Sequence, residues 1–308
     1  MGGFMICLKC KMRFKITIVL MFLAVLATVG VFVVEKRGVL AQKQSLENAT
    51  IENTGKFRIV SLVPSITETL YMLELSESIV GVSRFCNFPP AATNLPTVGG
   101  LTDASVEAIV RLKPTHLVAS SPNKETCEAV EKFGIKTLIV DINSLNDIYN
   151  SVWKIAEEFN ATDRAEKWLA NMEQLSARIS ENVPKKSPKV LICAGRDSSS
   201  FDRIYAAGEK SFYADIIRLA GGVNACELNV SIALISAEGV MKINPDIIID
   251  IVMNANNNGV SDALNEWAKF LSVKAVEDAR VYVVEEEYAV RPGPRIGLLL
   301  ERVASYIQ

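Results

Sequence analysis

The alternation of apolar and polar positions divides the chain into regions of different predicted structure. From residue 57 onward, short apolar runs alternate with stretches that carry apolar residues at helical spacing. The apolar runs predict buried strands at residues 57–63, 79–82, 116–119 and 137–140. Helices are predicted between them, the first opening with a capping box formed by Ser65 and Glu68. This alternation is typical of an α/β fold with a parallel sheet.

The middle of the chain is predicted to be helical, without an intervening strand. Residues 146–159 predict one helix, and residues 163–182 predict a second with Thr162 as its N-cap. Apolar residues recur in the second helix at i, i+3, i+4 and i+7 spacing, namely Ala165, Trp168, Leu169, Met172, Leu175 and Ile179. A helix of about twenty residues is roughly 30 Å long. After Pro184 the α/β pattern resumes and continues to a last helix from about Arg295.

Two parts of the chain resemble each other at a fixed offset of 131 positions. The letters RIV at residues 58–60 parallel KVL at residues 189–191. EAIVRLKP at residues 107–114 parallels EGVMKINP at residues 238–245, and each of these segments leads into an apolar strand. A match that keeps one offset over this span indicates two related lobes.

These patterns together predict an α/β fold of two Rossmann-like lobes with mainly parallel sheets. The N-terminal lobe covers residues 57–145 and the C-terminal lobe residues 188–308. Connecting helices at residues 146–187 join the lobes and include the long backbone helix. Because a rigid helix restrains the lobes, a cleft between them would close only slightly and would suit a large preformed ligand.

The N-terminal segment, residues 1–41, has the pattern of a signal peptide or a membrane anchor. Four cationic residues between Lys9 and Lys15 precede an unbroken apolar run at residues 16–34, just long enough to span a bilayer. The segment is either cleaved after Ala41 or retained as an anchor, and no lipobox cysteine follows the run. Both alternatives place the remainder outside the cytoplasm, with residues 42–56 as a polar tether.

Charge and cysteine content exclude some classes of protein. The 308 residues carry a formal net charge of −2, which gives no support to nucleic-acid binding. Cys7 and Cys10 form a C-x-x-C pair, but no second pair accompanies them, so a zinc or redox site is not expected there. The other cysteines are widely spaced and are either disulfide-bonded or free buried thiols, and they are Cys86, Cys127, Cys193 and Cys226.

The inventory of catalytic and metal-ligating side chains is thin. His116 is the single histidine and stands at the start of an apolar strand, where a structural role is expected. A serine triad would require this histidine, and the sequence contains neither a G-x-S-x-G elbow nor a Walker loop. One imidazole cannot supply a zinc or manganese site. We therefore expect no catalytic residues, no resident cofactor and no bare-metal site.

Several segments, taken in order, resemble a known family. RIVSLVPSITE at residues 58–68, VGVSRFCNFPP at 80–90 and VEAIVRLKP at 106–114 are similar to the first lobe of helical-backbone (class III) periplasmic solute-binding proteins of ABC importers. LAGGVN at residues 219–224 and RPGPRI at 291–296 are similar to the second lobe. The family includes proteins that bind vitamin B12 and iron siderophores, and the CNFPP letters are closest to its B12-binding branch.

The resemblance implies functional roles for particular residues. Glu107 and Glu238 match the glutamates, one per lobe, that dock on arginines of the permease. Phe85 and Arg291 match residues that line the ligand cleft, whereas Leu101 and Ile232 stand where B12-binding proteins carry tryptophan. The remaining candidates, taken from their spacing alone, are Arg84, Phe88 and Tyr288.

The sequence thus predicts an extracytoplasmic, monomeric binding protein that captures a metal chelate and delivers it to an ABC permease. The chelate is expected to be a corrinoid or an iron siderophore, with heme as a further possibility. Two alternatives remain at this stage: a membrane-anchored ligand sensor of the same fold, and an exported α/β hydrolase. Cleavage of the N-terminal segment and disulfide pairing are left open.

Overall fold

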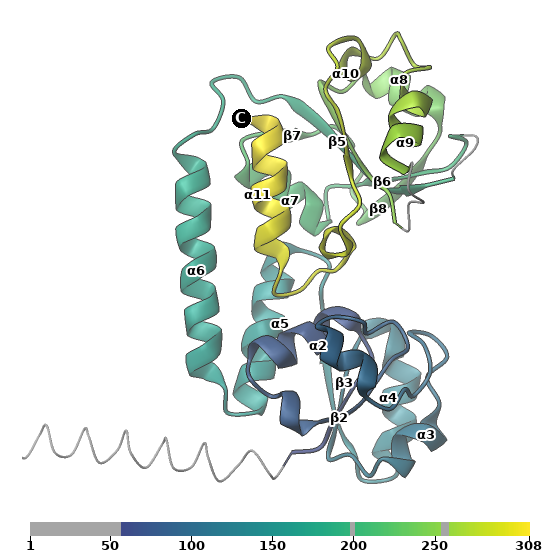
Figure 1. Cartoon of the computed structure of the whole chain (residues 1–308), viewed down its shortest axis with the longest axis vertical. Helices are drawn as coiled ribbons and strands as arrows, with labels where there is room; N and C mark the ends of the chain where they lie inside the picture. Colours follow the sequence, from purple (N-terminus) through teal and green to yellow (C-terminus); the bar gives the residue numbers. More distant parts are fainter. Residues whose placement is uncertain (1–56, 198–200, 254–258) are drawn as a thin grey trace, which may run out of the picture. The chain divides into compact units, whose positions relative to one another are not determined.

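The computed structural model describes residues 57–197, 201–253 and 259–308, and Figure 1 shows how they are arranged. The N-terminal segment 1–41, with Cys7 and Cys10, and the tether 42–56 lie outside these residues. Within the three ranges, no helix combines the length and the apolar content that crossing a membrane requires. The same three ranges fold around two β-sheets.

The first sheet consists of four parallel strands in the order β2-β1-β3-β4. The strands are β1 (Ile59–Ser61), β2 (Ile79–Val82), β3 (His116–Ser120) and β4 (Lys136–Val140). The helices that connect them include α2 (Pro64–Met72), α3 (Val106–Arg111) and α4 (Lys124–Glu131). Every residue of β1 and β3 is buried, as expected for central strands of a parallel sheet covered on both faces. We call this part, residues 57–143, lobe 1.

The second sheet belongs to residues 189–308, which we call lobe 2. Its strand order is β10-β9-β5-β6-β8, with β7 also paired to β5. The strands are β5 (Lys189–Arg196), β6 (Ile204–Ala207), β7 (Val223–Asn224), β8 (Ile232–Ile235), β9 (Ile247–Ile251) and β10 (Val281–Val284). The helices are α7 (Phe212–Leu219), α8 (Ala237–Ile243), α9 (Gly259–Trp267), α10 (Lys274–Glu277) and α11 (Ile296–Ile307).

The predicted fold class, two α/β lobes with mainly parallel sheets, is confirmed. The pairs β5–β9, β9–β10 and β5–β7 are parallel. The antiparallel extension of the second sheet by β6 and β8 was not predicted.

Two helices connect the lobes, α5 (Leu145–Glu158) and α6 (Thr162–Ser180). Helix α6 has 19 residues, which corresponds to roughly 28 Å. The predicted N-cap is wrong: Ala161 caps α6, because its carbonyl accepts the first hydrogen bonds from Arg164 and Ala165. Five of the six predicted apolar residues of α6 are buried, namely Ala165, Trp168, Met172, Leu175 and Ile179.

One apolar core extends without interruption from lobe 1 through the connecting helices into lobe 2. Leu117 of β3, Trp168 of α6, Ile216 of α7 and Leu299 of α11 all belong to it. Helix α11 packs on both α6 and α7, and α6 lies beside α11 in Figure 1. The indole nitrogen of Trp168 donates a hydrogen bond to the carbonyl of Pro294 over 2.8 Å. The lobes are therefore joined by shared packing as well as by the chain.

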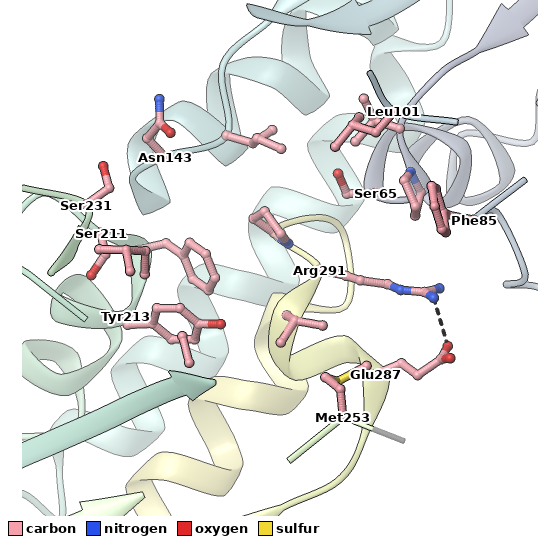
Figure 2. Close-up of a pocket in the computed structure, with 18 of the residues that line it drawn as sticks. Ser65, Phe85, Leu101, Asn143, Ser211, Tyr213, Ser231, Met253, Glu287 and Arg291 are labelled. Carbon is pink, nitrogen blue, oxygen red and sulfur yellow. Dashed lines mark ion pairs between the residues drawn. The ribbon is translucent and has the colours of Figure 1, made fainter. Parts of the chain in front are cut away.

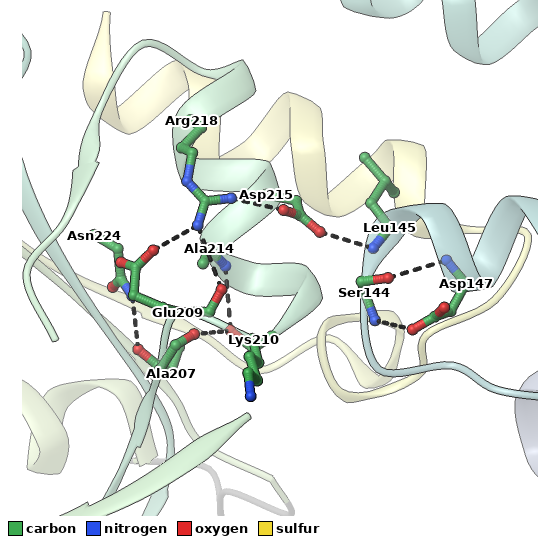
Figure 3. A network of polar contacts seen from close by, with 12 residues as sticks. Ser144, Leu145, Asp147, Ala207, Glu209, Lys210, Ala214, Asp215, Arg218 and Asn224 are labelled. Atoms are coloured by element: carbon green, nitrogen blue, oxygen red, sulfur yellow. Dashed lines mark hydrogen bonds and ion pairs between the residues drawn. The ribbon is translucent and has the colours of Figure 1, made fainter. Parts of the chain in front are cut away.

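Polar contacts reinforce the junction between α5 and α7 (Figure 3). The amide of Leu145, the first residue of α5, donates to a carboxylate oxygen of Asp215 on α7 over 2.9 Å. The other oxygen of Asp215 pairs with Arg218, whose guanidinium also pairs with Glu209. Ser144 caps α5 through a hydrogen bond from the amide of Asp147. The start of α5 is thus held by its own cap and by lobe 2.

The two lobes repeat the same hydrogen-bond geometry at the predicted offset. In lobe 1 the amide of Thr115 donates to the carbonyl of Arg58 over 2.8 Å. In lobe 2 the amide of Asp246 donates to the carbonyl of Lys189 over the same distance. Thr115 and Asp246, like Arg58 and Lys189, stand 131 positions apart. The sequence repeat therefore corresponds to a structural repeat of the strand–helix–strand unit.

His116 is buried at the start of β3 between two aromatic rings. The rings of Phe57 and Phe159 lie edge-on to the imidazole, with centroids at 5.5 Å and 5.1 Å. Its Nε2 lies 3.1 Å from a carboxylate oxygen of Glu158, which also pairs with Lys136. Burial lowers the pKa of His116 and outweighs the opposing attraction of Glu158. The imidazole is therefore neutral at pH 7, as a structural histidine.

The lowered pKa of His116 predicts that stability falls in mild acid. Below about pH 6.5 the unfolded chain binds a proton on this imidazole that the folded chain does not yet bind. The free energy of unfolding should therefore decrease as the pH falls from about 7.5 to about 5.5. Urea denaturation should show a weaker decrease for His116→Gln, which cannot titrate. An equal decrease in the free energy of unfolding of the two proteins would contradict the lowered pKa of His116.

Candidate functional site

A cavity of about 740 Å³ lies between the lobes and is lined by residues of both. Figure 2 shows the lining side chains. Most of the wall area is apolar, and polar side chains from both lobes also line it, among them Arg84, Asn143, Ser231 and Arg291. A cavity of this size and character is typical of a site for a small molecule. Five of the seven predicted ligand-binding residues line it, namely Arg84, Phe85, Leu101, Ile232 and Arg291.

The first residues of α2 form the lobe 1 end of the cavity. Pro64 is the first helical residue, and the extended Val63 precedes it. The predicted capping box is therefore wrong, because Ser65 lies inside the helix and no side chain caps α2. Ser65 is 2% exposed, lines the cavity, and its hydroxyl has no hydrogen-bond partner in the described structure. A buried hydroxyl without a partner is uncommon in folded proteins.

A loop of lobe 1 supplies one aromatic wall with a cationic edge. Phe85 is 52% exposed and faces the cavity. The guanidinium of Arg84 lies 5.5 Å from the centroid of this ring and pairs with Asp103. Arg84 holds the pKa of the Asp103 carboxyl below its usual range. Leu101, half-buried, completes this wall.

The start of α7 supplies the opposite wall from lobe 2. Ser211 caps α7 and is followed by Phe212 and Tyr213, all three at the cavity. The hydroxyl of Tyr213 donates a hydrogen bond to the carbonyl of Ala289 over 2.8 Å. Burial raises the pKa of this phenol, so Tyr213 is neutral. The thioether of Met253 also lines the cavity, after the end of β9.

Four charged residues form a network beside the cavity. Glu68 of α2 has a side chain that is 1% exposed, and it accepts two hydrogen bonds from Arg295 at 2.8 Å and 2.6 Å. Arg291 lies between Glu68, at 3.4 Å, and Glu287, at 3.0 Å. The 3₁₀ helix η4 (Glu287–Val290) leads directly to Arg291. Lobe 1 and the segment before α11 are thus joined by buried charge pairing.

Two further predicted ligand-binding residues do not line the cavity. The ring of Phe88 packs against Arg295, whose guanidinium carbon lies 3.8 Å from the ring centroid. Tyr288 packs against the shared apolar core. Both positions were chosen from spacing alone, and spacing cannot tell which neighbour of a cavity residue faces inward. Sequence reasoning missed Ser65, Asn87, Tyr213, Met253 and Glu287. Helical spacing gave no signal for Glu287, because its partner Arg291 is the extended residue that follows a 3₁₀ helix.

The predicted docking glutamates occupy equivalent places in the two lobes. Glu107 lies in the first turn of α3 and Glu238 in the first turn of α8, and both are exposed. Each helix is capped by a serine, Ser105 or Ser236, whose hydroxyl accepts from the amide three residues later. Glu107 also pairs with Arg111 over 2.7 Å. The structural repeat therefore gives each lobe one exposed glutamate at an equivalent position.

The described residues contain no group of three or more histidine, cysteine or acidic side chains placed to hold a metal ion. His116 lies in the core of lobe 1, away from the residues that line the cavity. The widely spaced cysteines are free and buried, namely Cys86, Cys127, Cys193 and Cys226. The chemistry of the cavity is therefore that of packing, hydrogen bonding and charge pairing.

Comparison with known proteins gives consistent matches. A family model described as periplasmic binding protein matches residues 59–288. The high-affinity heme uptake system protein IsdE of Staphylococcus aureus is 28% identical over 264 residues, covering 80% of this chain and 86% of that protein.

Two solved structures extend the likeness to the fold. A possible iron-binding (periplasmic solute-binding) protein of Staphylococcus epidermidis is similar with a TM-score of 0.69, 26% identity, and coverage of 82% of this chain and 98% of the other. The structure of S. aureus IsdE complexed with heme is similar with a TM-score of 0.65, 26% identity and the same coverage.

The buried charge network predicts a large effect of removing the charge of Glu68. In Glu68→Gln, Arg295 and Arg291 would lose their buried counter-charge, and the free energy of unfolding should fall by about 3–5 kcal/mol. Glu301→Ala is the control, because Glu301 pairs with Arg178 of α6 on the surface. That exposed pair should contribute about 1 kcal/mol or less. Equal losses in the two variants, measured by urea denaturation, would contradict a special role for Glu68.

Proposed function

Because the chain belongs to the periplasmic binding protein family, whose members bind substrates for ABC importers and are not enzymes, we propose that it is a heme-binding protein. It captures heme in the cavity between the lobes and presents it to an ABC permease outside the cytoplasm. The observation that carries the proposal is a mainly apolar cavity of about 740 Å³ with arginines on its lining.

The chemistry of heme matches the two kinds of wall. A porphyrin has flat apolar faces and two carboxylates at one edge. Phe85 and Phe212 offer aromatic surface to the faces from opposite lobes. Arg84 and Arg291 offer guanidinium groups to carboxylates.

Heme explains the site better than the expected corrinoid. Leu101 and Ile232, which stand where B12-binding proteins carry tryptophan, both line the cavity as aliphatic walls. Aliphatic side chains provide less flat area than tryptophan against a corrin ring. Cobalamin is also much larger than heme, because it carries a nucleotide loop. The relative that is 28% identical has a name that describes heme uptake, which supports the same choice.

The cavity offers two side chains of the types that bind heme iron, Tyr213 and Met253. The hydroxyl of Tyr213 is committed to the carbonyl of Ala289, and burial disfavours its phenolate. Met253 has a neutral thioether that needs no deprotonation. We therefore propose Met253, rather than Tyr213, as the side chain that contacts the iron of the bound heme.

Delivery to the permease is assigned to Glu107 and Glu238. They stand on equivalent helices, one in each lobe, and both are exposed. A pair of anions, one per lobe, gives cationic groups of a permease two complementary contacts. The docking surface is thus separate from the residues that line the cavity.

The proposed ligand predicts saturable hemin binding by the purified full-length chain. Titration followed by the visible absorption of hemin should show one site, and cobalamin should give no saturable signal. Ile232→Asp should weaken hemin binding about tenfold or more, because it places a carboxylate against the apolar face of the ligand. Leu234→Asp is the matched control, since Leu234 lies on the same strand, is exposed, and does not line the cavity. Failure of the wild-type chain to bind hemin would contradict the proposal.

The docking assignment predicts a separation of transport from binding. The double variant Glu107→Ala and Glu238→Ala should lose uptake of labelled hemin in cells that depend on this chain, while hemin affinity stays unchanged. Glu125→Ala is the control, because Glu125 is an exposed first-turn glutamate of α4. Normal uptake by the double variant would contradict docking and favour a sensor of the same fold. Lost affinity would show that the glutamates act on the cavity instead.

A further inference from the structure

The lining arginines of the cavity are already paired with carboxylates of the protein. Arg84 pairs with Asp103, and Arg291 pairs with Glu68 and Glu287. A ligand carboxylate that approaches Arg291 therefore meets a guanidinium whose positive charge is shared. Recognition of an anionic ligand at this position therefore depends on which protein carboxylate the ligand displaces from Arg291.

The two carboxylate partners of Arg291 differ in how firmly they are held. Glu68 is 1% exposed and is fixed by two short hydrogen bonds from Arg295. Its contact with Arg291 is long, at 3.4 Å. Glu287 lies closer to Arg291, at 3.0 Å, but its side chain is 41% exposed. Since a carboxylate that leaves an arginine must be hydrated, Glu287 can leave at low cost and Glu68 cannot.

Glu287 also forms a contact between the lobes. Its Oε1 accepts a hydrogen bond from the side-chain amide of Asn87 over 2.9 Å, while its Oε2 pairs with Arg291. Asn87 belongs to the lobe 1 loop that carries Phe85, and all of these residues line the cavity. In Figure 2 the side chain of Arg291 points toward Glu287, and the pair lies on the same side of the cavity as Phe85. The carboxylate of Glu287 thus accepts contacts from both the guanidinium of Arg291 and the side-chain amide of Asn87.

We propose that Glu287 is a specificity-determining residue that competes with the ligand for Arg291. A carboxylate of the ligand displaces Glu287 from the guanidinium, and Glu287 turns towards solvent. A ligand without a free carboxylate leaves the Arg291–Glu287 pair intact and gains no binding free energy from this arginine. The inference rests on the proposed function, and it narrows the ligand class to chelates with a free carboxylate at the edge.

Neutralising Glu287 tests the competition. Glu287→Gln keeps the shape and a carbonyl for Asn87 but removes the negative charge, so Arg291 becomes available. The variant should bind hemin about two- to fivefold more tightly than wild type, the range expected for a partly exposed ion pair. Hemin dimethyl ester, which lacks free carboxylates, should bind both proteins equally. Both probes are titrated into the purified full-length chains in the same dilute detergent.

Glu286→Gln is the matched control for this experiment. Glu286 is the adjacent residue, pairs with Arg302 of α11, and does not line the cavity, so its hemin affinity should equal that of wild type. Thermal unfolding of both variants verifies that the fold is retained.

The possible outcomes separate this inference from the proposed function. If wild type binds hemin but Glu287→Gln binds it equally or more weakly, competition by Glu287 is overturned and the heme assignment stands. If the ester gains as much affinity as hemin, the effect is not one of carboxylate competition, and the inference is likewise overturned. If wild type binds neither probe, the proposed function is wrong, and the inference that rests on it is wrong as well.

Discussion

The uninterrupted apolar core that links the two lobes is the constraint on which the rest of this structure depends. Two α/β units joined by a single strand or loop could rotate freely about the connection. Here Trp168 of α6 and Leu299 of α11 belong to the same core as the sheet of lobe 1 and helix α7. Changing the angle between the lobes would expose this packed surface to water, at about 25 cal/mol for each Å². The cavity is therefore held at nearly fixed width.

A fixed cavity explains where the structure tolerates buried charge. Glu68 and Arg295 come from parts of the chain more than two hundred residues apart, and their pairing needs positions accurate to a fraction of an ångström. Such a pair rarely adds net stability by itself, because both groups lose their hydration. It can be retained where rigid packing already holds both partners. The core supplies that rigidity, and Glu68 also contacts Arg291, which lines the cavity, at 3.4 Å.

The sequence predicted those parts of the structure that depend on local patterns. The four strands of lobe 1, the long helix and the related lobes follow from periodicity and from the 131-residue offset, whereas the antiparallel strands β6 and β8 were not predicted. Four cavity positions followed from the family resemblance, namely Phe85, Leu101, Ile232 and Arg291. The partners of Arg291 could not be predicted, since three consecutive glutamates, residues 285–287, offer equal local signals and only packing decides that Glu287 faces Arg291. The burial of the unpaired Ser65 hydroxyl could not be predicted either. The sequence suggested that Ser65 caps the helix, but α2 begins one residue earlier, at Pro64.

A cavity that cannot close far must recognise its ligand by exchange of individual side-chain contacts. In a hinged receptor, the free energy of ligand contact drives closure, and selectivity follows from how completely the lobes meet. In this chain the shared core restricts that motion. Discrimination between ligands must therefore come from side chains that can move while the lobes stay in place. Glu287 is such a group, because it is partly exposed on a one-turn helix and holds Asn87 and Arg291 at once. Its displacement changes the charge of the cavity wall while the packed scaffold stays in place.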